Sequence, residues 1–132
     1  MIDKWADFIK RMKKKYFDIG QIACPAFPNE MIRFDERGFN HLIMKNGKYR
    51  SKADQLRRLE QIHIIPNILY SHATFDMYKK VAEVSYWAFI QKTEMKMIKV
   101  IVRKILNGKL HFYSVMTKDL PKSTQAPEKG LL

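Results

Sequence analysis

The chain has 132 residues, one cysteine and a formal net charge of +12. Its hydrophobic content of 46% is sufficient for one globular domain with a core of its own. Because Cys24 is the only cysteine, an intramolecular disulfide and a zinc site made of cysteines are both excluded, which favours a reducing compartment. No apolar run reaches the length of a transmembrane helix, and the N-terminus does not resemble a secretory signal, so we expect a cytoplasmic protein without a transmembrane segment.

The excess of Lys and Arg limits the kinds of partner that the protein is expected to bind. Basic side chains outnumber acidic ones by 25 to 13. Such an excess attracts polyanions, so nucleic acid is the first candidate partner, an anionic membrane the second and an acidic protein the third.

Residues 1–18 predict a basic amphipathic helix. Its apolar face is formed by Trp5, Phe8, Ile9, Met12 and Tyr16, and lysines and arginines occupy the remaining positions. We favour packing of this face on the body of the protein, and the alternative is that residues 2–17 contact a membrane surface or a partner. Residues 19–31 contain Gly20, Pro25 and Pro28 and predict a linker.

The next segment, from residue 32, predicts a short extended stretch followed by two helices. The first helix begins after Asp35 and ends at Asn46-Gly47. Spacings of four residues place Arg37, His41 and Lys45 in one column along it. Ser51 resembles the cap of a second helix that runs to about His63. Pro66 is expected to stop this second helix.

The remaining residues favour strands, and the clearest signal is a hairpin. Strands are expected at residues 73–78 and 84–91, a loop at 92–96 and a disordered tail at 119–132. Between residues 97 and 117, two β-branched runs flank Asn107-Gly108, which predicts a two-residue type I′ turn. The whole order predicts an α+β domain at residues 32–118, with N-terminal helices packed on a three- to four-stranded antiparallel sheet.

A two-residue turn fixes which side chains of this hairpin share a face. The predicted core face carries Ile98, Val100, Val102, Tyr113 and Val115. The opposite face carries Lys99, Ile101, Arg103, Phe112, Ser114 and Met116. This second face is either a solvated sheet surface or a site that holds phosphate. If the loop is longer by one residue, the faces invert against one strand, and His111 replaces Ser114 beside Arg103.

The side chains that carry chemistry match one reaction, the cleavage of RNA by its own 2′-hydroxyl. No metal motif, cofactor motif or glycine-rich phosphate loop is present, so we expect no cofactor. The reaction needs a base, an acid and cations around the phosphate, and His41 is the best titrating candidate. Trp87 either stacks a base or belongs to the core. The candidate RNA-binding residues are Arg37, Lys45, Arg57, Arg58 and Trp87.

From residue 32 to 117 the sequence resembles the phage-type members of the barnase–EndoU–colicin–RelE (BECR) superfamily of nucleases. The matching residues are Ile32-Arg33-Phe34, Phe39-Asn40-His41-Leu42, Tyr86-Trp87-Ala88-Phe89, Ile98-Lys99-Val100-Ile101-Val102-Arg103 and Phe112-Tyr113-Ser114-Val115-Met116. The resemblance implies two helices on a four-stranded antiparallel sheet and metal-independent endoribonuclease activity, a hydrolase found in toxins and phage proteins. It nominates His41, Lys99 or Arg103, and Ser114 as catalytic residues.

Three hypotheses follow for the function. The first is a metal-independent endoribonuclease, phage-derived or toxin-like, with RNA as its partner, an inhibitor or antitoxin protein as a second candidate partner, and His41, Lys99, Arg103 and Ser114 as its catalytic set. The second is a non-catalytic module of the same fold that binds nucleic acid or protein. The third is a membrane-surface protein anchored by the apolar face of residues 1–18.

Overall fold

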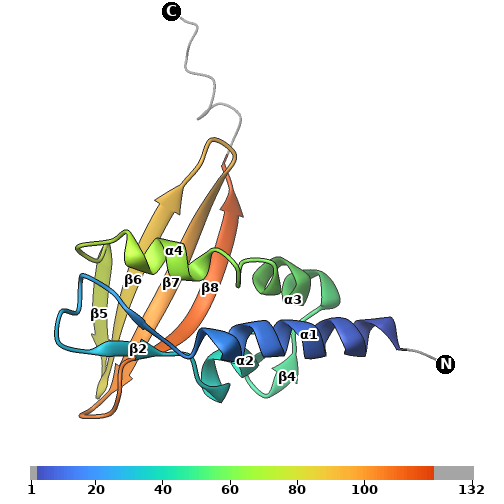
Figure 1. The fold of residues 1–132 in the computed structure, drawn as a ribbon, viewed down its shortest axis with the longest axis horizontal. Helices are drawn as coiled ribbons and strands as arrows, with labels where there is room; N and C mark the ends of the chain where they lie inside the picture. The colour runs from blue at the N-terminus through green and yellow to red at the C-terminus, as the bar shows by residue number, and fades with distance from the viewer. Residues whose placement is uncertain (1–2, 121–132) are drawn as a thin grey trace, which may run out of the picture.

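The computed structural model describes residues 3–120, and these residues form four helices and eight strands (Figure 1). The helices are α1 (Lys4–Ile19), α2 (Glu36–Ile43), α3 (Lys52–Leu59) and α4 (Ile65–Tyr70). The strands are β1 (Gln21–Ala23), β2 (Met31–Arg33), β3 (Met44–Lys45), β4 (Lys48–Tyr49), β5 (Met77–Val81), β6 (Val84–Lys92), β7 (Lys96–Ile105) and β8 (His111–Asp119).

Six of these strands form one sheet, in the order β1-β2-β8-β7-β6-β5. The pair β2–β8 is parallel and the other pairs are antiparallel. The predicted α+β class is therefore confirmed, but the main sheet has six strands instead of three or four. Figure 1 shows α4 crossing one face of this sheet, and the core between them contains Ile65, Ile68, Leu69, Phe89 and Val100.

The N-terminal helix packs on the body of the protein, as favoured above. Met12 and Tyr16 are buried, and the Tyr16 hydroxyl donates a hydrogen bond to the carbonyl oxygen of Asp35 at 2.7 Å. Phe8 and Ile9 are partly buried and pack against the same core, so this half of the apolar face is used inside the fold. No helix within residues 3–120 combines the length and the apolar character that crossing a bilayer requires.

The segment expected to be a linker is partly wrong, because β1 lies within it. Ile22 of β1 is paired with Ile32 of β2, and both side chains are buried. β1 is at the edge of the sheet, and its alternation of one buried residue between two exposed ones shows that one of its faces packs on the core. Of the expected tail, residue 119 belongs to β8, and residues 121–132 lie outside the described part of the chain.

The first Asn-Gly pair forms the tight turn that was expected at the second. Asn46 and Gly47 both have positive φ, 53° and 78°, and Lys45 is paired directly with Lys48 across them. This geometry is that of a two-residue hairpin loop. Helix α2 consequently ends at Ile43, so Lys45 does not continue the helical column of Arg37 and His41.

The second Asn-Gly pair lies in a five-residue loop, 106–110, and the positive φ of 49° falls on Leu106. Burial explains the difference, because Leu110 is only 1% exposed and its N–H donates to the Glu30 carboxylate. Glu30 also pairs with Lys104 at 2.9 Å. The end of the hairpin is therefore anchored to the segment before β2, which is incompatible with the predicted two-residue turn.

The register of β7 and β8 is correct for half of the hairpin and shifted for the other half. Ile101 is paired with Ser114 as predicted, but a bulge beyond it pairs Arg103 with His111. The bulge turns Phe112 into the core, where its side chain is fully buried, and brings Tyr113 to the opposite face. These two residues thus exchange the faces that the sequence predicted for them.

The other elements are close to the prediction, with two differences. The side chain of Ser51 accepts a hydrogen bond from the Asp54 N–H, which confirms the cap of α3. Helix α3 ends at Leu59, and Pro66 stands in the first turn of α4 instead of ending α3. Strand β6 is where it was expected, whereas β5 begins at Met77, later than the predicted strand at 73–78.

Candidate functional site

The candidate site lies on the sheet face turned away from α4, which we call the outer face. The register places Lys79 of β5, Tyr86 of β6 and Arg103 of β7 in one row across it. On strands β5 to β8 this face carries five cations, Lys79, Lys92, Lys99, Arg103 and Lys118, and no Asp or Glu. A sheet surface that carries several cations and no carboxylate attracts anions.

His41 reaches this face from the last turn of α2. Its ring lies on that of Tyr113, with the ring centres 4.2 Å apart, and the guanidinium carbon of Arg103 is 4.3 Å from the centre of the same tyrosine ring. The bulge in β8 is what brings Tyr113 to this position. Tyr113 therefore bridges the candidate acid–base group and the candidate phosphate-binding group.

His41 is neutral at physiological pH and keeps a ring nitrogen without a partner. Burial, followed by the positive charges of Arg50, Arg58 and Arg103, lowers the pKa of His41 to about 4. Its Nδ1 atom is buried and makes no hydrogen bond within the described residues. A neutral imidazole can accept a proton, so His41 has the form that a general base requires.

Arg103 is oriented by a chain of polar side chains. Its Nε donates to His111 Nε2 at 3.1 Å, and His111 Nδ1 lies 3.2 Å from the carbonyl oxygen of Lys109. Because Nε2 accepts, the proton of His111 belongs on Nδ1. Burial lowers the pKa of His111, which is consistent with this neutral form. Arg37 lies 3.5 Å from the same Nδ1 and forms an ion pair with Asp35 at 2.7 Å.

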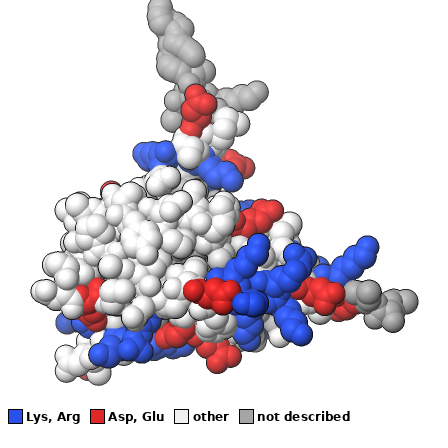
Figure 2. Space-filling model, viewed as in Figure 1, with Lys and Arg blue, Asp and Glu red and all other residues white. Residues whose placement is uncertain are grey.

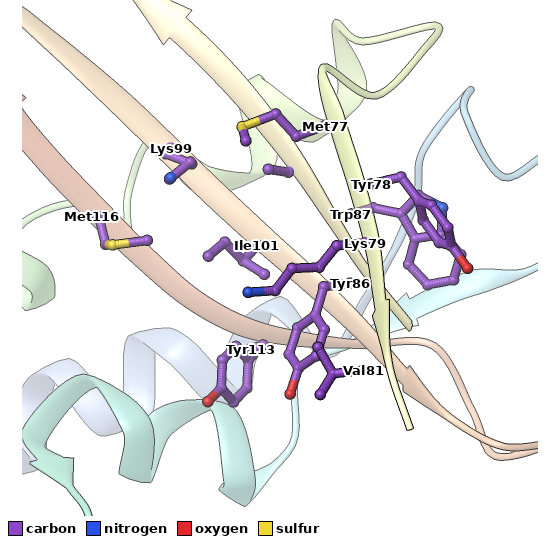
Figure 3. Close-up of a pocket in the computed structure, with 11 residues that line it drawn as sticks. Met77, Tyr78, Lys79, Val81, Tyr86, Trp87, Lys99, Ile101, Tyr113 and Met116 are labelled. Carbon is purple, nitrogen blue, oxygen red and sulfur yellow. The ribbon is translucent and has the colours of Figure 1, made fainter. Parts of the chain in front are cut away.

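Next to this cluster the outer face is hollowed into a pocket of about 510 Å³ (Figure 3). It is lined by Met77, Tyr78, Lys79, Val81, Tyr86, Trp87, Ala88, Lys99, Ile101, Tyr113 and Met116. Figure 3 shows Tyr86 and Tyr113 side by side at one end, and their ring centres are 5.6 Å apart. Lys79 extends toward this end from β5. Tyr113 thus lines the pocket and also contacts His41 and Arg103, so the pocket and the His41 cluster are adjacent.

Two of the predicted catalytic residues, His41 and Arg103, are brought together, and a third, Lys99, lies in the pocket. Ser114 is on the outer face but only 2% exposed, and it accepts a hydrogen bond from Arg58 at 3.2 Å. Arg58 also donates to the carbonyl oxygen of Val115 and pairs with Asp54. Ser114 and Arg58 therefore tie α3 to β8, and their polar groups are occupied.

The remaining predicted RNA-binding residues are scattered. Arg37 and Arg57 are more than half exposed, each beside an aspartate, and Lys45 is exposed in β3. Trp87 borders the pocket, but its register position is on the core face, opposite Val102, and its ring packs edge-on against Phe27 at 5.2 Å. Its packing matches the core alternative.

Three residues of the site were not assigned to it from the sequence, Lys79, Tyr86 and Tyr113, whereas His111 lies beside Arg103 as the alternative with a longer loop predicted. Tyr86 could have been found, because pairing the strand at 84–91 with the hairpin places it opposite Arg103. The position of Tyr113 depends on the bulge between residues 112 and 114, for which the local sequence carries no signal.

Within residues 3–120, no three side chains of His, Cys, Asp or Glu lie together in a way that suits a metal ion. Comparison with known proteins gave no match either: no family model, no curated protein and no solved structure is significantly similar to this chain.

Proposed function

We propose that the protein is a metal-independent endoribonuclease of the BECR kind, which cleaves RNA by attack of a 2′-hydroxyl on the adjacent phosphate. One observation carries the proposal. His41, a neutral histidine, and Arg103 both contact the ring of Tyr113, on a sheet face that carries cations and no acidic strand residue. Base and cation are two of the requirements of this reaction, and the nucleophile belongs to the substrate.

The roles follow from the positions of the side chains. His41 accepts the proton of the attacking 2′-hydroxyl, and Arg103 stabilises the negative charge on the phosphoryl oxygens. His111 holds the guanidinium of Arg103 through Nε and leaves its terminal nitrogens for the phosphate. The hydroxyls of Tyr86 and Tyr113 lie at this end of the face, and one of them donates the proton that the leaving 5′-oxygen takes up.

The test is RNA cleavage in the presence of a chelator, with analysis of the fragment ends. We expect fragments that end in a 2′,3′-cyclic phosphate. Removal of the base in His41→Ala should slow cleavage by about 10²-fold or more, and Arg103→Met should have a comparable effect. His63→Ala is the matched control, because His63 is exposed and its ring bonds only to the carbonyl oxygen of Glu60.

Three results would contradict the proposal. They are full cleavage by folded His41→Ala, fragments with other ends, and no cleavage of any RNA. Salt-sensitive RNA binding without cleavage would identify the second hypothesis, a binding module that has the fold and the charge without the catalysis.

A further inference from the structure

The pocket beside His41 and Arg103 has a chemical character that cleavage alone does not require. We propose that it binds the base of one nucleotide of the RNA and that it prefers bases with a keto oxygen at C4 of a pyrimidine or C6 of a purine, uracil and guanine, over cytosine and adenine, which carry an amino group there. The inference rests on the proposed function, since it assigns a substrate preference to the same site.

The shape of the pocket suits a flat ring. Met77, Ala88 and Ile101 lie in one row across β5, β6 and β7, and the small side chain of Ala88 leaves a hollow between its two larger neighbours. Met116 and Tyr86 stand around this hollow. Methionine and tyrosine side chains both make favourable contacts with the face of an aromatic ring. A volume of about 510 Å³ is in the usual range for small-molecule sites and accommodates a base.

The position of the pocket suits a base that belongs to the cleaved strand. Tyr86 is paired with Lys79 on one side and with Arg103 on the other, so it separates the pocket from the phosphate-binding arginine by one strand position. Adjacent strands lie about 5 Å apart, which is a distance that one nucleotide spans between its base and its phosphate. A base in the pocket therefore leaves its phosphate next to Arg103.

The charges of the pocket favour keto bases. Lys79 and Lys99 are its charged lining residues, and no carboxylate lines it. An ammonium group only donates hydrogen bonds, so it can bind O4 of uracil or O6 of guanine, whereas the N7 acceptor is common to guanine and adenine and does not discriminate. The exocyclic amino groups of cytosine and adenine are donors at the corresponding positions, so they cannot accept a hydrogen bond from either lysine. The tyrosine hydroxyls can donate or accept and do not reverse this preference.

Binding of short 2′-O-methyl oligonucleotides tests the inference, because such RNA lacks the nucleophile and cannot be cleaved. Two matched pairs differ only in the group of interest: uridine against cytidine, and inosine against adenosine. We expect the keto member of each pair to bind about tenfold more tightly, as a hydrogen bond to a charged group would provide.

Substitutions then locate the preference. Lys79→Met and Lys99→Met should each reduce the ratio of affinities within a pair toward one. Lys80→Met is the matched control, because Lys80 lies on the same strand but on the opposite face, where it is paired with Ser85. It should leave the ratio unchanged, because it does not line the pocket.

A second set of variants fills the pocket while its charges stay. Met116→Trp and Ile101→Phe should lower affinity for all four oligonucleotides. If Ile101→Phe does not melt cooperatively, the test rests on Met116→Trp, whose position is only partly buried. Equal affinities within both pairs, or an unchanged ratio in both lysine variants, would overturn the inference. Cleavage of RNA without a base preference contradicts only this inference, whereas a preference without cleavage contradicts only the proposed function.

Discussion

At the scale of single residues, the environment of His41 determines when it can act as a base. It is partly buried and surrounded by the positive charges of Arg50, Arg58 and Arg103, and both factors oppose protonation. The catalytic consequence is that the basic form is retained well below neutral pH.

We therefore expect an acidic limb of kcat/KM near pH 4 instead of near the ordinary histidine value of about 6.5. Cleavage should be nearly constant from pH 7 to about pH 5.5 and fall at lower pH. The measurement is kcat/KM across this range with a fluorogenic RNA. A half-maximal rate near pH 6.5 would show that His41 is not the group that titrates.

His41 and His111 together make the stability of the folded protein depend on pH. Burial, the largest cause for both, lowers the pKa of His41 and of His111 in the folded protein, so the unfolded chain binds more protons once the pH is below about 6.5. Stability should thus be greatest above this value and decrease toward pH 4. Urea unfolding at several pH values measures the slope, and His41→Phe should reduce it. A slope that is unchanged in this variant would contradict the assignment.

At the scale of elements, Gly38 allows α1, α2 and β8 to meet. A Cβ atom at this position would collide with the hydroxyl of Tyr16 and lie 2.7 Å from the carbonyl oxygen of Phe112. Since the Tyr16 hydroxyl is itself bonded to the backbone of Asp35, it has no free direction in which to move. The close packing of these three elements depends on the absence of a side chain.

Gly38→Ala should accordingly destabilise the protein by about 1–3 kcal/mol, although alanine is the better helix former. Thermal or urea unfolding measures the loss. Asn40→Ala, at an exposed position of the same helix, is the control and should change stability little. An equal or higher stability of Gly38→Ala would show that α1 can shift without cost.

The elements also show what local sequence can and cannot predict. The Ser51 cap, strand β6 and the pairing of Ile101 with Ser114 were all predicted, because each depends on residues close in sequence. The bulge at Tyr113 and the five-residue loop before it were not, because they depend on burying Leu110 and on the distant carboxylate of Glu30. The half of the candidate site that was missed is the half that the bulge creates.

At the scale of the whole molecule, positive charge is present on both sides of the sheet. Figure 2, which views the side of α4, shows lysines and arginines gathered along α1 and a region with few charges over α4. The outer face carries its own row of Lys79, Lys99 and Arg103. Net charge alone therefore does not say which surface the RNA follows.

The salt dependence of RNA binding separates the two surfaces. Each phosphate contact that is lost should reduce the slope of log K against log salt by about 0.7 for a single strand. We expect this reduction for Arg103→Met, and no reduction for Lys10→Met on the exposed side of α1. The opposite result would place the RNA along α1.

The position of β8 between β2 and β7 has a consequence for the order of folding. The strands β1 and β2 come early in the chain, yet their neighbour in the sheet is the last strand, which ends at Asp119. Helix α2 also packs on β8. The contacts of β2 and α2 with β8 thus form only after nearly the whole chain has been made, and such long-range closure makes folding slow. The hairpin of β6 and β7, which needs no distant partner, is the part that can form first.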